Sequence, residues 1–381
     1  MRIALLVSGM LQKKTESLTI TTQEFAKKLT KKNHKVFIIT QKKFPSPSIE
    51  IKDKITYYRI NKWGKFSLYN KLISFPFAIR KMQKEGKFNI IHGFSASPIL
   101  VLRGILAKNF FSNKTKIVHT LKSYPIKKDV KAGGKNKLIS RIGDWGYKLL
   151  NLADIITVPT NVHAKKLIRK GVNKNKIKVI HSFINLDKFF PKDKKKLKEQ
   201  YGYQDNKVIF NYGSMWEIKG TDQLIKSMPD LIKQFPNVRL LLAPRNRKQA
   251  LNKYLKVIQE MELTKYVQFI LEDVNIEDYV NLADVIVLPY PHLEGTEGNP
   301  SCLLEALACK TPVVTTNLPE LNELFSECTK VVEPNNIEEL TKMVSFVLKN
   351  DNQRIIEEGL KIAQKFNIDQ NVDSFISVYN E

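Results

Sequence analysis

Two glutamates stand eight positions apart in the second half of the chain. Glu297 lies near the end of a loop that runs from Pro289 to Gly298, and Glu305 lies beyond it. Carboxylates accept hydrogen bonds in pairs from vicinal hydroxyls. The two acids therefore indicate a site for a hydroxylated ligand, with one acid near the ligand's phosphate and the other at a more distant hydroxylated part.

An anion site is expected beside these acids. The apolar, β-branched run Val285 to Leu288 predicts a buried parallel strand. A helix should follow the loop, with Asn299 as N-cap and Pro300 at the first helical position, where a missing N–H costs nothing. The free amides at this helix start belong mainly to Ser301 and Cys302. Backed by the positive end of the helix dipole, they suit an anion, and phosphate best of all.

This stretch resembles the family 4 retaining glycosyltransferases of the GT-B fold. Their hallmark is Glu, seven residues and a second Glu, followed by Ala-x-Ala-x-x-x-Pro-Val-Val. Glu297 and Glu305 have this spacing, whereas the alternative first acid, Glu294, does not, and the pattern continues from Ala306 to Val314. The resemblance extends over nearly the whole chain and implies an enzyme that uses a nucleotide diphosphate sugar.

A second motif of the family is Gly-Arg-x-x-x-x-Lys-Gly, in which the Arg and the Lys hold the donor diphosphate. Here Gly213 follows an expected strand and Lys219-Gly220 is retained, but Ser214 stands at the arginine position. A lysine at a turn is ordinarily a solvated surface residue, and the surrounding motif favours a phosphate-binding role. Serine can replace the bidentate arginine contact only with a neutral hydrogen bond.

The resemblance implies a role for each of these residues. Lys219 and the helix start would stabilise charge on the leaving diphosphate, Glu297 would orient the sugar and Glu305 would bind the ribose diol. The nucleotide base would lie against Leu271 and Glu272, through main-chain contacts. The donor-binding residues expected in this way are Ser214, Gly298, Asn299, Ser301, Cys302 and Glu305.

A further catalytic position lies in the first half of the chain. Related enzymes carry a histidine after the strand that corresponds to Lys116 to Thr120, and it faces the donor sugar. Here Lys122 occupies that position and His119 lies three residues earlier. An offset of three residues near a strand reverses the direction of the side chain. Lys122 is therefore the third catalytic candidate, with Lys219 and Glu297, and His119 is interpreted as structural, although the sequence leaves open which of the two faces the sugar.

Alternating strand and helix patterns predict an α/β fold of the GT-B type, with two Rossmann-like domains facing each other across a cleft. The expected divisions are residues 1–190 as the acceptor-side domain, 191–206 as a linker, 207–365 as the donor-nucleotide domain and 366–381 as a helix that crosses back. The length of 381 residues is ample for two cores. A nicotinamide or flavin cofactor has no support, because the chain has no G-x-G-x-x-G motif.

Composition favours a cytoplasmic protein that needs no cofactor or metal. The three cysteines lack metal-ligand spacing. The short apolar run that follows Arg2 is a first strand rather than a signal peptide. With no Asp-x-Asp pair in the sequence, the cationic site of Lys219 is expected to stand in for a metal ion.

Charge is distributed unevenly. Residues 1–200 contain 45 Lys and Arg against 11 Asp and Glu, whereas residues 201–381 contain 18 against 26. A basic half attracts polyanions, so nucleic acid, anionic lipid and polyanionic glycan are all candidate partners; a generally lysine-rich proteome explains the lysines but not the acidic second half. The basic amphipathic pattern of Tyr69 to Lys87 and the lysine-rich loop Lys127 to Lys137 favour a peripheral position on the inner membrane face.

The predicted function is transfer of a hexose from a nucleotide diphosphate sugar to an acceptor hydroxyl with retention of configuration, in the synthesis of cell-surface glycan or glycolipid. The alternatives are a nucleotide-sugar epimerase, which shares the architecture, and a nucleic-acid-binding protein. The Lys-Gly motif and the two glutamates argue for transfer, and no recognisable nucleic-acid module is present. The expected partners are the nucleotide sugar, a glycan or lipid-linked acceptor and an anionic membrane surface, with no specific nucleic acid.

Overall fold

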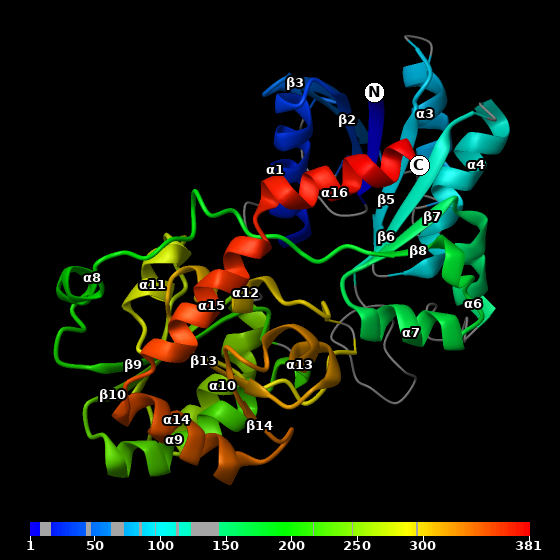
Figure 1. The fold of residues 1–381 in the computed structure, drawn as a ribbon. Helices are drawn as coiled ribbons and strands as arrows, with labels where there is room; N and C mark the ends of the chain where they lie inside the picture. The colour runs from blue at the N-terminus through cyan, green and yellow to red at the C-terminus, as the bar shows by residue number, and fades with distance from the viewer. Residues whose placement is uncertain are drawn as a thin grey trace. The chain divides into compact units, whose positions relative to one another are not determined.

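The structure is a computed structural model that describes residues 1–7, 17–42, 47–61, 72–83, 86–95, 97–111, 114–122, 145–215, 217–245, 247–294 and 296–381. The described chain forms two compact units. The N-terminal unit contains the described residues up to His181 together with Ile368–Glu381, and the C-terminal unit is Ser182–Asn367. Each unit is built on its own sheet (Figure 1).

The sheet of the N-terminal unit has the order β3-β4-β2-β1-β5-β6-β7-β8. All neighbours are parallel except β3 and β4. Its strands are β1 (Arg2–Val7), β2 (Lys35–Gln41), β3 (Ile49–Lys52), β4 (Ile55–Ile60), β5 (Ile90–Ser95), β6 (Lys116–Leu121), β7 (Ile155–Val158) and β8 (Ile177–Val179). Its helices are α1 (Ser17–Lys31), α3 (Ser74–Gln83), η1 (Pro98–Val101), α4 (Leu102–Phe111), α6 (Trp145–Lys148), η2 (Leu149–Leu152), α7 (Asn161–Arg169), η3 (Lys174–Lys176) and α16 (Ile368–Asn380).

The sheet of the C-terminal unit is parallel throughout, in the order β11-β10-β9-β12-β13-β14. Its strands are β9 (Lys207–Gly213), β10 (Val238–Pro244), β11 (Val267–Phe269), β12 (Val285–Leu288), β13 (Val313–Thr316) and β14 (Lys330–Val332). Its helices are α8 (Lys194–Tyr201), η4 (Glu217–Lys219), α9 (Thr221–Gln234), α10 (Arg247–Glu260), α11 (Ile276–Leu282), α12 (Ser301–Ala308), α13 (Pro319–Phe325), α14 (Ile337–Lys349) and α15 (Gln353–Lys365).

Both faces of this second sheet are buried, which explains the continuous apolar run of β12. Val285 and Val287 belong to one apolar cluster, whereas Ile286 and Leu288 belong to another. Successive side chains of a strand point to opposite faces, so the two clusters are the cores on either side of the sheet. The prediction of a buried parallel strand at Val285–Leu288 is confirmed.

In each unit, the same pair of hydrogen bonds joins the beginnings of two neighbouring strands. The Asp154 carboxylate accepts from the Ile117 amide at 2.7 Å, and the Asp154 amide donates to the Ile117 carbonyl at 3.0 Å. Asp284 and Val208 make the same two contacts in the C-terminal unit, at 2.7 and 2.8 Å. Ala153-Asp154 and Ala283-Asp284 therefore occupy equivalent places in the two sheets. The two sheets confirm the predicted architecture of two Rossmann-like domains.

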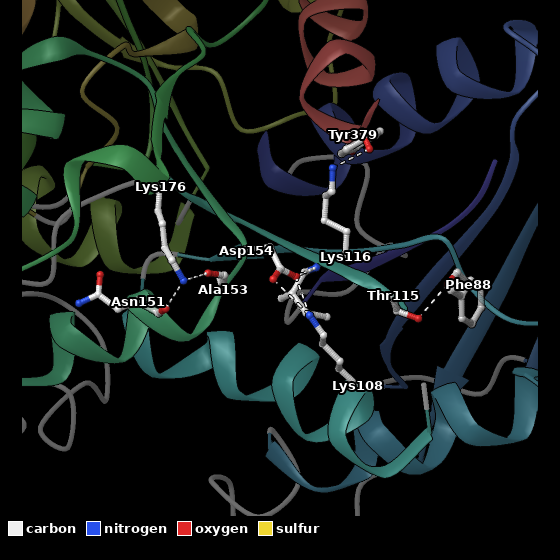
Figure 2. A network of polar contacts seen from close by, with 10 residues as sticks. Phe88, Lys108, Thr115, Lys116, Asn151, Ala153, Asp154, Lys176 and Tyr379 are labelled. Atoms are coloured by element: carbon white, nitrogen blue, oxygen red, sulfur yellow. Dashed lines mark hydrogen bonds and ion pairs between the residues drawn. The ribbon is translucent and has the colours of Figure 1, made fainter. Parts of the chain in front are cut away.

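The C-terminal helix α16 packs on the N-terminal unit, next to α1 (Figure 1). Lys28 of α1 forms an ion pair with Asp369 at 2.8 Å. At the other end of α16, the Tyr379 hydroxyl lies 2.6 Å from Nδ1 of the buried His92, and Lys116 Nζ donates to the Tyr379 carbonyl at 3.0 Å (Figure 2). These contacts fasten the last helix to the first sheet.

The expected linker is corrected by the structure. Contacts divide the units after His181, earlier than the expected end of the first domain at residue 190. Half of the expected linker 191–206 is helix α8, and the whole segment belongs to the C-terminal unit. Its Leu197 is buried, and Lys198 forms an ion pair with Asp284 at 2.6 Å. Two other lysines of this segment also pair with acids of the second unit, Lys192 with Asp278 and Lys194 with Asp284.

The basic segment Tyr69 to Lys87 is described at residues 72–83 and 86–87, and helix α3 occupies only Ser74–Gln83. The loop Lys127 to Lys137 lies outside the described residues. Among the helices of the described ranges, none is long and apolar enough to cross a membrane.

Candidate active site

Lys219 is presented by a tight turn between β9 and α9. The next residue, Gly220, has a left-handed backbone with φ of +68°. A Cβ atom built on Gly220 would lie 1.7 Å from the carbonyl oxygen of Pro289, which follows β12. Only glycine allows this approach, so the Lys219 turn lies directly against the beginning of the loop that leads to α12.

The Lys219 ammonium lies over that loop. Its Nζ donates to Oγ1 of Thr296 and lies 4.8 Å from the centre of the Tyr290 ring. Burial lowers the pKa of Lys219, while the nearby Cys302 and Glu297 oppose this change. Thr296 directly precedes Glu297, so the predicted cation contacts the segment that carries the predicted first acid.

Helix α12 begins one residue later than predicted. Pro300 is the N-cap, with φ of −66° and ψ of 129°, and Ser301 is the first helical residue. The extended backbone of Pro300 corrects its expected place inside the helix. Asn299 is consequently not the N-cap, and no side chain caps this helix start. The amides of Ser301 and Cys302 remain the first of the helix, as the anion site requires.

Asn299 is fully buried, with 0% of its surface exposed. Neither its amide oxygen nor its amide nitrogen has a hydrogen-bond partner in the described part of the chain. A buried polar group without a partner costs about 1 to 3 kcal/mol. In the sequence, Asn299 stands between Glu297 and the helix start, so this cost falls in the segment that carries the first acid.

Glu305 is held by a tyrosine from β9. The Tyr212 hydroxyl donates to Glu305 Oε2 at 2.7 Å and to the Cys302 carbonyl at 3.1 Å. Its ring stacks on Phe210, with ring centres 5.0 Å apart and planes at 12°. Burial raises the pKa of the Glu305 carboxyl, whereas the Tyr212 hydrogen bond and the charges of Arg245 and Lys188 lower it. The carboxylate is therefore oriented before any ligand arrives.

The remaining predicted donor residues lie in loops that follow strands of the sheet of the C-terminal unit. Ser214 is half-buried directly after β9, and Gly298 is buried beside Glu297. Leu271 and Glu272 follow β11; Leu271 is half-buried and Glu272 is exposed. Parallel strands present their carboxyl ends at one edge of a sheet, where ligands of α/β folds bind.

The two candidates of the N-terminal unit differ in their surroundings. His119 lies within β6, is buried, and its Nε2 is 3.0 Å from Oγ of Ser95. Burial lowers its pKa to about 3, so the imidazole is neutral at physiological pH. Lys122 is half-buried just after β6, and its amide donates to the Ser95 carbonyl at 3.0 Å. The contacts of His119 support its interpretation as structural.

Sequence reasoning missed four residues of the site. Tyr212, Arg245, Tyr290 and Thr296 each contact or influence the predicted residues. Three of them adjoin recognised features, since Tyr212 precedes the glycine of the lysine motif and the other two lie in the loop before the glutamates. Arg245 carries no such signal. Among the described residues, no group of three or more His, Cys, Asp and Glu could hold a metal ion.

The two halves of the chain match two sequence models of known families. Residues 193–361 match the model described as glycosyl transferases group 1, and residues 18–188 match that of glycosyltransferase family 4. An uncharacterized glycosyltransferase of Methanocaldococcus jannaschii is 27% identical over 277 residues, which span 66% of this chain and 63% of that relative. The processive diacylglycerol alpha-glucosyltransferase of Acholeplasma laidlawii is 27% identical over 63% of this chain and 72% of its own length.

Solved structures show the same fold. Sucrose-phosphate synthase from Thermosynechococcus elongatus superposes with a TM-score of 0.83 at 20% identity, covering 100% of this chain and 98% of the other. Anabaena HepE, solved with UDP and glucose, gives a TM-score of 0.76 at 16% identity, covering 100% and 99%. The fold is that of the GT-B glycosyltransferases. This chain belongs to the group 1 glycosyltransferases, family 4.

Proposed function

We propose that this enzyme transfers a hexose from a nucleotide diphosphate sugar to an acceptor hydroxyl with retention of configuration. The proposal is carried by the contacts around the start of α12. Lys219 donates to Thr296, next to Glu297, and the Tyr212 hydroxyl joins Glu305 to the Cys302 carbonyl. A cation and the first amides of a helix suit a diphosphate. Retention follows from the glutamate spacing, which matches that of retaining enzymes.

The donor lies with its diphosphate between Lys219 and the first amides of α12. Lys219 and these amides stabilise the charge that develops on the departing diphosphate, a contribution that is usually the largest single one in such reactions. Glu305, oriented by Tyr212, accepts from the ribose hydroxyls. Glu297 accepts from the sugar. Lys122 is proposed as a third catalytic residue that meets a phosphate or sugar oxygen.

The donor class has independent support from the fold. HepE, which shares it, was solved with UDP and glucose. A nucleotide-sugar epimerase of the same architecture would bind the same donor but would return an isomerised sugar without an acceptor. The reaction product therefore separates the two functions.

Two variants test the division of roles. Glu305→Ala should weaken the binding of the nucleoside diphosphate, because it removes the ribose acceptor, whereas Glu297→Ala should leave that binding nearly unchanged and reduce turnover. Titration calorimetry with UDP, GDP and ADP, paired with an assay of transfer from the matching glucose donors, measures both effects. Glu294→Ala is the matched control, as it removes a third acid of the same segment at the wrong spacing. Reversal of the two phenotypes would contradict the assignment.

We further propose that the acceptor is carried on a lipid, because the Acholeplasma relative is a diacylglycerol glucosyltransferase. The burial of side chains in α3 limits which of its residues can contact an anionic membrane. Most apolar residues of α3, including Phe75 and Ile79, are buried in the N-terminal unit. Its exposed side shows Phe77, 61% exposed, with Arg80 and Lys81. The helix would therefore contact the membrane through the charges of Arg80 and Lys81 and the ring of Phe77. It would not insert a whole apolar face into the lipid.

Cosedimentation with vesicles tests this surface. We expect binding to vesicles that contain anionic lipid, little binding to neutral ones, and release by high salt, since each basic residue contributes about 1 kcal/mol within a Debye length of about 8 Å. The double variant Arg80→Glu/Lys81→Glu should lower the bound fraction. Lys226→Glu/Lys248→Glu changes the net charge equally at exposed positions of the C-terminal unit and should bind like the wild type. Equal loss in both variants would assign the attraction to net charge alone.

A further inference from the structure

The diphosphate site of this enzyme departs from the family motif at one position. Ser214 stands where the motif has an arginine, and its hydroxyl offers only a neutral hydrogen bond. A diphosphate carries charge on both phosphates, and a guanidinium matches phosphate oxygens bidentately, which a lysine cannot do. A second cation near Ser214 would therefore be needed to match the charge of the diphosphate.

Arg245 lies directly alongside Ser214. Strands β9 and β10 are parallel neighbours whose register pairs Gly213 with Pro244. One step further along, the Arg245 amide donates to the Gly213 carbonyl at 2.7 Å. Arg245 thus stands at the same edge of the sheet as the altered position, on the adjacent strand, and its side chain is exposed.

The charge of Arg245 acts on two predicted residues of the site, Lys219 and Glu305. It contributes to lowering the pKa of Lys219, and it lowers the pKa of Glu305. Within the described ranges, the Arg245 side chain has no hydrogen bond or ion pair. Arg247, two residues further on, is instead held by Asp273. Of these two arginines, Arg245 is the one that remains available to a ligand.

We propose that Arg245 supplies, from the adjacent strand, the guanidinium contact to the donor diphosphate that related enzymes obtain from the position of Ser214. This inference rests on the proposed function, because it assigns a residue to the same donor site. It makes Arg245 a donor-binding residue that the sequence motif does not reveal. It also accounts for the loss of the motif arginine, since two guanidinium groups side by side at this edge would repel each other.

The test compares three variants by calorimetry. Arg245→Ala should weaken the binding of the nucleoside diphosphate that the wild type binds best by roughly 10-fold to 100-fold, and should leave binding of the corresponding nucleoside unchanged. Arg247→Ala, which removes a guanidinium from the same segment, should bind the diphosphate like the wild type. The double variant Ser214→Arg/Arg245→Ala returns an arginine to the motif position and should recover most of the lost affinity.

The outcomes separate the two proposals. If the wild type binds none of UDP, GDP and ADP, the proposed function fails and the Arg245 inference fails with it. If the wild type binds one of them and Arg245→Ala binds it equally well, or loses nucleoside binding to the same extent, only the inference on Arg245 is overturned. Arg245→Gln keeps the length of the side chain and a donor group, and it repeats the measurement if the alanine variant melts at a lower temperature.

Discussion

Lys219→Ala will reduce the rate of sugar transfer by a factor of roughly 100 to 1000, the usual effect of removing one fixed donor from the developing charge. The ammonium lies against the loop before α12, where it donates to Thr296 and faces the Tyr290 ring. Without this ammonium, the departing diphosphate keeps its contacts with the helix amides but loses one cation. Burial lowers the pKa of Lys219, so the charged group does not stabilise the fold, and the melting temperature should stay close to that of the wild type.

The control for this result is Lys226→Ala, on the exposed side of α9. It removes a lysine seven residues away and should retain wild-type activity. Steady-state kinetics, together with thermal unfolding of both variants, make the comparison. A folded Lys219→Ala enzyme with activity within about threefold of the wild type would show that this cation has no part in the chemistry.

Gly220→Ala will destabilise the C-terminal unit strongly and lower activity with it. Two costs add at this position. An alanine in the left-handed region costs roughly 1 to 2 kcal/mol, and its Cβ would meet the Pro289 carbonyl oxygen at 1.7 Å, an overlap that must be relieved at a further cost of about 1 to 3 kcal/mol. Relief moves the Lys219 turn away from the loop before α12, which separates the cation from the glutamates.

Gly202→Ala is the matched control. Gly202 has φ of +78°, and no atom lies within 4 Å of its would-be Cβ, so only the backbone cost applies. Urea unfolding curves of the two variants measure the difference directly. Equal unfolding midpoints for Gly220→Ala and Gly202→Ala would mean that the contact with Pro289 has no energetic weight.

The sequence by itself determined the family, the fold and the residues of the central motif. Strand β12 at Val285–Leu288 has the bounds that its apolar run predicts. Such runs are local signals, because a strand that is buried on both faces must be apolar at every position. The spacing of Glu297 and Glu305 is also local, and it was enough to identify the glycosyltransferase family.

Only the tertiary structure decided how the motif residues are held. Tyr212 reaches Glu305 across 93 positions of sequence, and Arg245 comes beside Ser214 because β9 and β10 are parallel neighbours. The full burial of Asn299, the inward apolar side of α3 and the place of α8 in the second unit are likewise set by packing. A parallel sheet brings the ends of distant strands to one edge, and the residues that meet there have no fixed spacing along the chain.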